Sequence, residues 1–375
     1  ADRSRGLGDV YKRQVRNTDE RAAETIAASL NLTPPTSRIL ASRGFTGIDE
    51  VQRYLEPSLH DLHDPFLLEP MKEATRIIGQ TIREKGRILV FGDYDVDGIS
   101  GSAILQRVIR LLGGDVEVLL PSRLTDGYSL TDDVTGRVLA REPSLVITVD
   151  NGITALEGAH RIAEAGVDLI IVDHHEPARE LPQARAILDP KLTGSAYPYR
   201  DLSATGVAFK LAWALCQDLP GGGDRGREVL LDSLGLVALG TVADVSPLTG
   251  ENRVLVSFGL RTLANTAHPG LQALMAAARV RTATLKAKDL AFRLGPLVNA
   301  PGRLGDPAIS LRLVSSESPD EAKEAARELA RANRRRQGLQ RSVLAEARLQ
   351  VKEQIAAGRP ALVLAAEGWH PGVTG

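Results

Sequence analysis

The sequence predicts an α/β fold with a mostly parallel sheet that helices cover on both faces. Short apolar runs such as RILVF at residues 87–91 alternate with helix-like segments between residues 71 and 199. Parallel strands need a crossover segment between them, and this alternation supplies one. After Tyr199 the pattern becomes mostly helical, and a long segment rich in Ala, Arg and Glu follows Ser318. We therefore expect one α/β domain, a long connecting helix and the start of a second α/β domain.

Size and composition are those of an ordinary globular protein. The chain has 375 residues, of which 43% are apolar and 25% charged, and its formal net charge is −1. This length is enough for two domains, and the near-neutral charge requires any nucleic-acid binding to come from local basic patches. One cysteine, Cys216, excludes an intramolecular disulfide, and no apolar run reaches the roughly 18 residues of a membrane helix. We expect a soluble, cytoplasmic protein without a membrane partner.

The first 70 residues differ in character from the rest. Residues 1–14 match no element that follows and resemble translated adaptor sequence, so we interpret them as a non-native leader. Residues 15–70 consist of helix-like fragments and loops, with a break at Pro34-Pro35. They predict a small helical N-terminal subdomain without chemistry of its own.

Residues 71–316 are expected to form the main domain. A helix from Met71 leads into the strand at 87–91, and DVEVLLP at residues 115–121 is the next strand. Three later strands each end in an aspartate: Asp150, Asp173 and Asp189. The helix between the first two begins with Thr154 and Glu157, a pair typical of a capping box.

A long helix is predicted from Ser318-Pro319 to about Ala357, where Gly358 would end it. We interpret residues 317–358 as a connector between domains, and its Arg334–Arg336 run as a solvated face in preference to a nucleic-acid contact. Residues 359–375 then begin a new strand and a new domain that is cut short.

The stretch DYDVDG at residues 93–98 is the strongest sign of chemistry. Its three acids are spaced two residues apart, so on an extended chain they project to one side. They follow a predicted strand, and open α/β sheets bind ligands at the carboxyl ends of their strands. Gly98 permits a close backbone approach. A solvated acidic turn would explain this motif alone, but the later strands that also end in aspartates favour a site.

Three further segments supply metal-type ligands: VDN at 149–151, VDHH at 172–175 and TVAD at 241–244. Buried carboxylates are costly unless they are paired or bind metal, and imidazole with carboxylates suits Mn²⁺ or Mg²⁺. The sequence lacks a phosphate-binding Walker loop and suggests no serine or cysteine nucleophile with a base partner. A two-metal site that hydrolyses phosphoesters with a metal-activated water is the chemistry that these residues predict.

These motifs, in this order, resemble those of the DHH phosphoesterases. The motifs D-x-D-x-D-G, D-N-G-I, VDHH and GTVADV carry the resemblance, and PSRLTDGYSL, PLVNAPGRLGDP and GWHPGVTG extend it over residues 70–375. The match is closest to the single-strand-specific 5′→3′ exonucleases of the family. The resemblance implies Mn²⁺- or Mg²⁺-dependent hydrolysis of single-stranded DNA in repair and recombination. It also identifies residues 71–316 as a DHH domain and residues 359–375 as the truncated start of a DHHA1-type domain.

The resemblance assigns roles to individual residues. His175 would face the scissile phosphate, and Asp93 would either bind metal or orient its neighbours. Asp173 would hold a histidine in the right tautomer or cap a strand end. Phe91 stands where some members carry a histidine ligand, so the first metal would have one protein ligand fewer. The implied metal ligands, with Asp150 as the bridging carboxylate, are Asp95, Asp97, Asp150, His174 and Asp244.

Substrate contacts follow from the remaining motifs. Arg123 and Arg303 are expected to bind phosphate, because the guanidinium fork matches phosphate oxygens. Asn299 lies beside Arg303 in the sequence, and Tyr128 would either stack on a base or pack in the core. The resemblance adds His370 as a contact to the substrate phosphate.

Two other functions remain open at this point. One is a DHH enzyme that cleaves short oligoribonucleotides or cyclic dinucleotides, although such enzymes usually lack the long connector and the helical N-terminal part. The other is a non-catalytic replication scaffold, although such relatives lose metal aspartates that this chain retains. Inorganic pyrophosphatases of family II share the chemistry but lack the NAPGR motif. The expected partners are single-stranded DNA, a single-strand-binding protein and a helicase, and we expect a monomer.

Overall fold

The structure is a computed structural model that describes residues 17–123, 126–127, 129–356 and 361–374. The predicted leader at 1–14, Tyr128 and the predicted helix end at Gly358 lie outside the described residues. The chain divides into two compact units, residues 1–61 and 62–375. The domain boundaries predicted at 70/71, 316/317 and 358/359 stay predictions.

The first unit is helical, as the sequence predicted for this part of the chain. Its elements are α1 (Glu20–Leu30), α2 (Pro34–Ser42), α3 (Ile48–Leu55) and the short turn η2 (Leu59–Asp61). Asp19 caps α1 by accepting a hydrogen bond from the Ala22 amide at 3.1 Å. The small core consists of Ile26, Leu40, Phe45 and Val51. This unit presents no cluster of metal-type ligands among its described residues.

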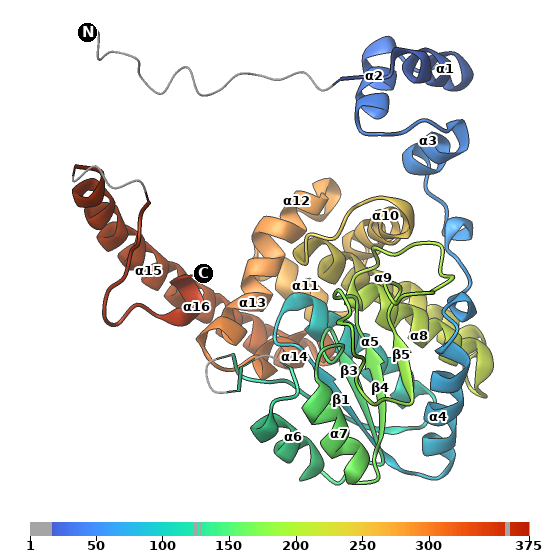
Figure 1. The fold of residues 1–375 in the computed structure, drawn as a ribbon, viewed down its shortest axis with the longest axis vertical. Coiled ribbons are helices and arrows are strands. Elements are labelled where there is room, and N and C mark those ends of the chain that lie inside the picture. Colours follow the sequence, from blue (N-terminus) through green and yellow to red (C-terminus); the bar gives the residue numbers. More distant parts are fainter. Residues whose placement is uncertain (1–16, 124–125, 128, 357–360, 375) are drawn as a thin grey trace. The chain divides into compact units, whose positions relative to one another are not determined.

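The first half of the second unit alternates strands and helices (Figure 1). Its elements are η3 (Pro65–Leu67), α4 (Met71–Arg83), β1 (Arg87–Gly92), α5 (Val96–Leu111), β2 (Asp115–Leu119), α6 (Asp132–Leu139), β3 (Leu145–Val149), α7 (Leu156–Glu164), β4 (Asp168–Val172) and β5 (Ala186–Leu188). The strands pair in the order β2-β1-β3-β4-β5, and every pair is parallel.

Helices cover both faces of this sheet. One core joins α6 and α7 to the side chains of β1, β3 and β4 that point to their face, among them Leu89, Val146 and Ile171. The other face packs against α5 and α8. Because side chains alternate along a strand, burial on both faces requires the nearly continuous apolar runs that the sequence shows. The α/β prediction is confirmed.

The second half of this unit is helical. Its elements are α8 (Ala204–Asp218), α9 (Gly223–Ala243), α10 (Gly250–Ala264), α11 (Pro269–Ala277), η4 (Thr282–Thr284), α12 (Ala287–Asp289), the π-helical turn η5 (Leu290–Leu294), α13 (Gly295–Leu304), α14 (Ala308–Ser315), α15 (Pro319–Ala356) and α16 (Pro371–Thr374). The predicted long helix is confirmed as α15, and the Ser318 hydroxyl caps it by accepting from the Glu321 amide at 3.4 Å. Among the described residues, no helix has the length and apolarity needed to cross a membrane.

Two local predictions were wrong. Residues 361–370 form no strand; instead, the Gln350 and Gln354 side chains of α15 bond to the backbone of Ala365 and Val363. A strand needs a neighbouring strand, and the described residues offer none here. Helix α7 begins at Leu156 with Ala155 as its N-cap, so Thr154 and Glu157 form no capping box and no side chain caps its first turn.

Candidate metal centre

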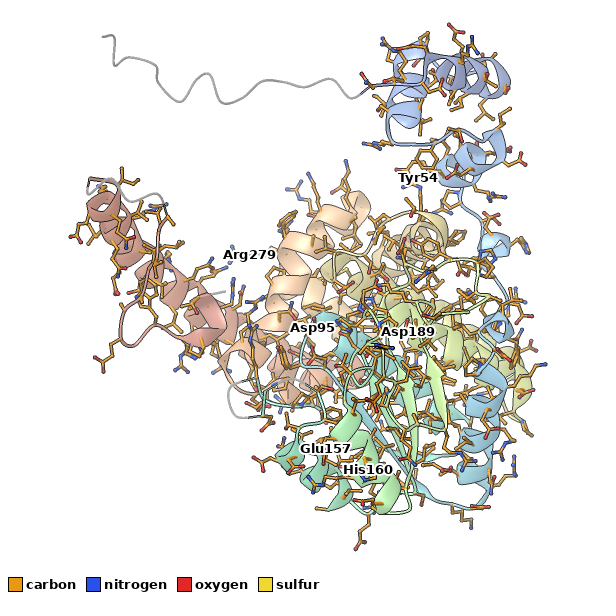
Figure 2. The ribbon with its side chains drawn as sticks, viewed as in Figure 1. Tyr54, Asp95, Glu157, His160, Asp189 and Arg279 are labelled. Atoms are coloured by element: carbon orange, nitrogen blue, oxygen red, sulfur yellow. The ribbon has the colours of Figure 1, made fainter. Side chains whose placement is uncertain are left out.

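The register of the sheet places four aspartates in a row. The ends of β1, β3, β4 and β5 lie opposite one another, and the residue after each of these four strands is an aspartate, so the four aspartates share one edge. The amides of three of them continue the ladder: Asp93 donates to Val149, Asp150 to Val172 and Asp173 to Leu188, at 2.9 to 3.1 Å. Asp189 completes the row, and Figure 2 shows Asp95 and Asp189 at this end of the sheet. We call Asp93, Asp150, Asp173 and Asp189 the aspartate edge.

The aspartate edge lies where the strand order reverses. From β1 the chain goes first to β2 on one side and then to β3 on the other, so the crossovers leave in opposite directions between β1 and β3. Such a switch point opens a crevice at the carboxyl ends of the strands. Asp93 follows β1 and Asp150 follows β3, so both flank this crevice.

The DYDVDG turn brings two more carboxylates into the crevice. Asp95 caps α5 by accepting from the amides of Asp97 and Gly98, at 2.9 and 3.1 Å. A Cβ at Gly98 would lie 2.5 Å from the Asp93 amide nitrogen, which explains why glycine occupies this position. The turn therefore sets Asp93 beside Asp95, whereas Asp97 lies in the first turn of α5 and is grouped with His174 and Asp244.

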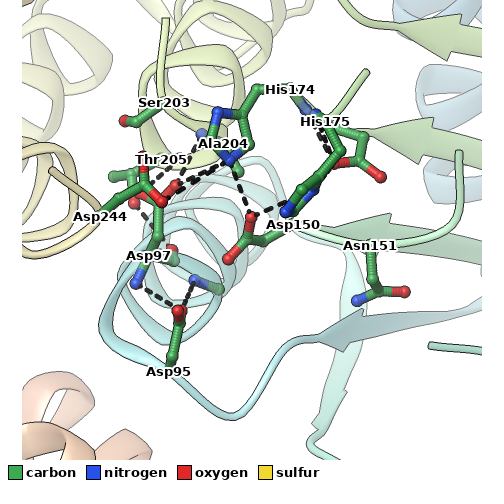
Figure 3. A network of polar contacts seen from close by, with 12 residues as sticks. Asp95, Asp97, Asp150, Asn151, His174, His175, Ser203, Ala204, Thr205 and Asp244 are labelled. Atoms are coloured by element: carbon green, nitrogen blue, oxygen red, sulfur yellow. Dashed lines mark hydrogen bonds and ion pairs between the residues drawn. The ribbon is translucent and has the colours of Figure 1, made fainter. Parts of the chain in front are cut away.

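Asp97 is fixed by the start of α8. Its Oδ2 and Oδ1 accept from the amides of Ala204 and Thr205, at 2.8 and 3.1 Å, and the Thr205 hydroxyl donates to the Asp97 carbonyl at 2.7 Å (Figure 3). A Cβ at Gly240 would lie 2.7 Å from Asp97 Oδ1, so α9 also packs closely here. This support for Asp97 was not predicted from the sequence, although the SAT segment before an apolar helix is a typical capping signal.

His174 lies between the carboxylates of several elements. Its Nε2 is 3.3 Å from Asp150 Oδ1, 3.8 Å from Asp97 Oδ2 and 3.9 Å from Asp244 Oδ1. Asp244 is the C-cap of α9, and Figure 3 shows His174 between it and Asp150. Asp150 holds a left-handed backbone conformation with φ of 64°, which is uncommon outside glycine and marks local strain.

Asp173 orients the second histidine. Its Oδ1 lies 2.7 Å from His175 Nδ1 and accepts from the His174 amide at 2.8 Å, while its Oδ2 accepts from the Ile153 amide at 3.0 Å. Burial opposes ionisation of Asp173, but these hydrogen bonds, led by the one from His175, lower its pKa. The bond to Asp173 raises the pKa of His175 in turn. The His175 side chain is half exposed, whereas that of His174 is mostly buried.

The electrostatics are those of a site with surplus negative charge. Burial, followed by the neighbouring Asp95, raises the pKa of Asp93 to about 7. Burial also raises the pKa of Asp97 to about 6, and raises that of Asp150 well above its usual value. Asp93 Oδ1 and His174 Nε2 are buried and have no hydrogen-bond partner within the described part of the chain.

Three overlapping groups of side chains have metal-binding geometry: Asp93 with Asp95 and Asp150; Asp97 with His174 and Asp244; and Asp150 with His174 and His175. In each group the ligand atoms lie within 4.8 Å of one another. Asp150 and His174 each belong to two groups, which suits two cations that share ligands. Oxygen and imidazole donors are the set that Mn²⁺ and Mg²⁺ accept. The residues present therefore fit a pair of divalent ions.

A cavity of about 270 Å³ opens beside these groups. Arg123, Asn299 and Arg303 line it together with Asp93, Asp95 and Asp244, so three of the predicted substrate residues lie next to the predicted metal ligands. The Arg123 guanidinium lies over the Tyr94 ring at 5.7 Å.

The other predicted substrate residues are placed differently. Asn299 Oδ1 accepts from the Val96 amide at 2.9 Å and thus supports the start of α5. His370 is not among the residues that line the cavity, and its Nδ1 accepts from the Gly372 amide at 3.1 Å. Arg303 Nη1 donates to the Gly372 carbonyl at 3.4 Å, so the segment of His370 lies close to Arg303. Tyr128 lies outside the described residues.

Comparison with known proteins agrees with this geometry. Residues 87–241 match the family model "DHH family, N-terminal domain". The chain is 36% identical over 371 residues to the single-stranded-DNA-specific exonuclease RecJ of Bacillus subtilis, an alignment that covers 98% of this chain and 46% of the relative. It covers 60% and 64% of the RecJ proteins of Dickeya dadantii and Escherichia coli. The chain thus spans less than two thirds of these curated relatives.

Solved structures of RecJ exonucleases are also similar to this chain. RecJ from Thermus thermophilus in complex with Mn²⁺ has a TM-score of 0.77 and 32% identity, over 96% of this chain and 50% of that one. A structure of exonuclease RecJ bound to manganese has a TM-score of 0.71 and 34% identity, over 84% of this chain and 77% of that one.

Proposed function

Because the chain belongs to the DHH family and, within it, to the RecJ exonucleases, we propose that it hydrolyses phosphodiester bonds of single-stranded DNA from the 5′ end. The observation that carries the proposal is the set of overlapping ligand groups around Asp150 and His174, beside a cavity lined by Arg123 and Arg303. Two arginines beside buried acids would bind a phosphate group of the substrate while metal ions on the acids promote cleavage of its phosphodiester bond.

Asp95, Asp97, Asp150, His174 and Asp244 would hold two Mn²⁺ or Mg²⁺ ions, and Asp93 would bind with them or orient them. Divalent ions there would neutralise charge on the phosphate and activate a water molecule for attack. The support for a shared role of Asp150 is its place in two of the three groups. The α8 amides that bind Asp97 would keep that carboxylate aimed at the crevice.

The remaining residues would act on the substrate. Asp173 holds His175 by Nδ1 and raises its pKa, and the ring so oriented would act on the phosphate or the leaving oxygen. Arg123 and Arg303 would bind the backbone or 5′-terminal phosphate in the adjoining cavity. Such contacts read the phosphate and not the base, which suits an enzyme without sequence preference.

We further propose that the chain acts as a monomer in the cytoplasm, with single-stranded DNA as its substrate and a single-strand-binding protein and a helicase as protein partners. Support for the DNA substrate comes from the RecJ relatives, which are named as specific for single-stranded DNA. The protein partners follow from the family resemblance alone.

The test combines cleavage with metal binding. The 375-residue chain is incubated with Mn²⁺ and a 5′-phosphorylated single strand, the matched duplex or a dinucleotide, and the products are resolved by length. We expect mononucleotides from the single strand. Asp244→Ala should lower the rate by more than the roughly 10–100-fold that loss of a supporting residue costs. Asp224→Ala, an exposed aspartate in the first turn of the same helix, is the matched control.

Two outcomes would contradict the proposal. Cleavage of the dinucleotide with long strands intact would identify an enzyme for short substrates. Binding of Mn²⁺ by calorimetry without cleavage of any of the three substrates would refute the activity proposed for this chain.

A further inference from the structure

A second polar cavity lies at the opposite ends of the helices that carry the proposed metal ligands. It has a volume of about 310 Å³ and lies between the second half of α5, the part of α9 from Arg225 to Leu236, the start of α11 and the junction of α14 with α15. This volume is near the lower end of the roughly 300–1,000 Å³ range typical of small-molecule sites. The two cavities share no lining residue.

Helix geometry separates this cavity from the metal centre. Asp95 caps the start of α5, whereas Arg110 lies in its last turn. At roughly 1.5 Å per residue, the two positions are about 22 Å apart along the helix. Arg225 and Asp244 lie at opposite ends of α9 in the same way. An anion in this cavity would therefore not contact the catalytic carboxylates.

The cavity is lined by more positive than negative charge. Arg107, Arg110 and Arg225 line it, and Glu317 is the one carboxylate among its lining residues. Arg107 is paired with Asp232 at 3.2 Å. No ion pair of Arg110 or Arg225 occurs within the ranges that the structure describes, so two guanidinium groups remain for an anion.

Two neutral groups add hydrogen-bonding capacity. His268 Nδ1 accepts from the Leu271 amide at 3.4 Å, which places the ring proton on Nε2 as a donor. Burial, followed by the charge of Arg107, lowers the pKa of His268 and keeps it neutral. The buried hydroxyl of Ser315 has no hydrogen-bond partner among the residues described. A buried hydroxyl is seldom left unsatisfied, and a bound oxygen would satisfy it.

Apart from Gln106, the rest of the wall is apolar. Leu111, Val229, Leu236 and Val314 contribute to it, and Leu236 and Val314 are almost fully buried. An apolar wall beside a few polar groups is the usual composition of a site for an organic ligand. A site for a bare ion would need no such wall.

We propose that this cavity binds a small phosphate monoester, with its phosphoryl group on Arg110 and Arg225 and its organic part against the apolar wall. The arginine forks match the phosphate oxygens, and His268 and Ser315 supply further hydrogen bonds. Inorganic phosphate offers the same phosphoryl chemistry without the organic part, so it distinguishes the two contributions. The inference does not rest on the proposed nuclease activity.

Calorimetric titration of the metal-free, 375-residue chain tests the proposal, with adenosine 5′-monophosphate, inorganic phosphate and an oligothymidine without terminal phosphates as probes. We expect the nucleotide to bind more tightly than phosphate. The double substitution Arg110→Gln and Arg225→Gln should weaken nucleotide binding at least about tenfold, equivalent to about 1.4 kcal/mol. Both arginines are exposed, so the fold should tolerate their replacement.

Two matched variants locate the binding. Arg227→Gln changes an exposed arginine of α9 that does not line the cavity, and Arg123→Gln removes an arginine of the other cavity. Arg227→Gln should bind the nucleotide like the parent. Arg123→Gln should keep the nucleotide binding that the double substitution weakens, even if it loses a separate binding event at the other cavity. Equal affinity in the double variant, or loss of all nucleotide binding in Arg123→Gln, would overturn the proposal. Phosphate that binds as tightly as the nucleotide would exclude a role for the apolar wall. If the double substitution weakened the binding of oligothymidine by the same factor, the cavity would belong to a nucleic-acid surface instead.

Discussion

The aspartate edge and a second buried cluster in the same unit use charge in opposite ways. The second cluster, which we call the Lys210 cluster, consists of Lys210, Glu251 and Tyr197. Lys210 and Glu251 are 0% and 1% exposed, and their charged groups are 2.6 Å apart. Glu251 also accepts from the Tyr197 hydroxyl at 2.7 Å and the His63 amide at 2.9 Å. Lys210 donates in addition to the His63 carbonyl at 2.6 Å.

In the Lys210 cluster every charge has a partner of opposite sign, whereas around the aspartate edge carboxylates outnumber cations. Asp93, Asp97 and Asp150 have raised pKa values because burial and like charges disfavour their ionised forms. A buried pair of opposite charges holds a structure together, and here it joins the chain at His63 to α8 and α10. An excess of buried charges of one sign is instead typical of a site that binds an ion of the opposite sign.

The largest effect is expected from breaking the matched cluster. Lys210→Met should destabilise the protein by about 3–5 kcal/mol, because Glu251 would remain as a buried, uncompensated charge. Urea unfolding followed by circular dichroism measures this loss. Adding Glu251→Gln in the same chain should restore part of the stability, because it removes the uncompensated charge and its one carbonyl oxygen can still accept from Tyr197 or from His63. A loss below about 1 kcal/mol for Lys210→Met would mean that water reaches the cluster.

A pH dependence is expected at the far end of the aspartate edge. Asp189 Oδ1 accepts from the Lys191 amide at 2.8 Å, its Oδ2 has no partner among the described residues, and burial raises its pKa to about 7. Its usual value is 3.8, so the folded state holds a proton that the unfolded state releases. The free energy of unfolding should therefore fall as pH rises from about 4 to about 7, and Asp189 accounts for at most about 1.4 kcal/mol per pH unit of this fall. Above about pH 7 the contribution of Asp189 should no longer change with pH.

Asp189→Asn should remove this part of the pH dependence, since the amide is neutral throughout and can still accept from Lys191. Urea midpoints of the metal-free parent and variant, measured from about pH 4.5 to about pH 8 so as to span the interval between the two pKa values, give the difference. Parallel curves for the two proteins would show that Asp189 keeps its usual pKa in the folded chain.

At the proposed metal centre, removal of one charge should have opposite effects with and without metal. Asp150→Asn relieves repulsion among the neighbouring aspartates, so the metal-free chain should gain about 1 kcal/mol of stability, the equivalent of a shift of about one pKa unit. The same change removes the carboxylate that we propose the two metal ions share, so Mn²⁺ should raise the melting temperature of the parent but not of the variant. A metal-free variant less stable than the parent would indicate that hydrogen bonds of Asp150, and not its charge, dominate.

The sequence predicted the aspartate edge more fully than the Lys210 cluster for a physical reason. Each acid of the edge directly follows an apolar strand, and parallel strands bring such positions together by their register. Lys210 and Glu251 lie on separate helices far apart in the sequence, and no local pattern signals that two helix faces will meet. Asn299 illustrates the same limit, because the NAPGR motif indicated a site residue but not that its side chain would reach the start of α5.

The smallest expected effect separates two roles of Asn299. Its Oδ1 accepts from the Val96 amide, which adjoins the proposed ligands Asp95 and Asp97. Asn299→Ala leaves that amide without its acceptor, at a cost of about 1 kcal/mol, as for the loss of a helix cap. If Asn299 positions the turn, Mn²⁺ affinity should fall about tenfold, the range typical of residues that support a ligand.

Asn265→Ala is the matched control, since Asn265 ends α10 and its side chain bonds only to Arg261 of that helix among the interactions described. Mn²⁺ titration and steady-state cleavage of a single strand separate the two roles of Asn299. Unchanged Mn²⁺ affinity together with a raised KM would assign Asn299 to the substrate alone, as the sequence predicted. Weaker Mn²⁺ binding with an unchanged KM at saturating metal would place Asn299 among the residues that shape the metal centre. The free energy lost at the Val96 amide would then reduce the binding of Mn²⁺ and not the binding of the substrate.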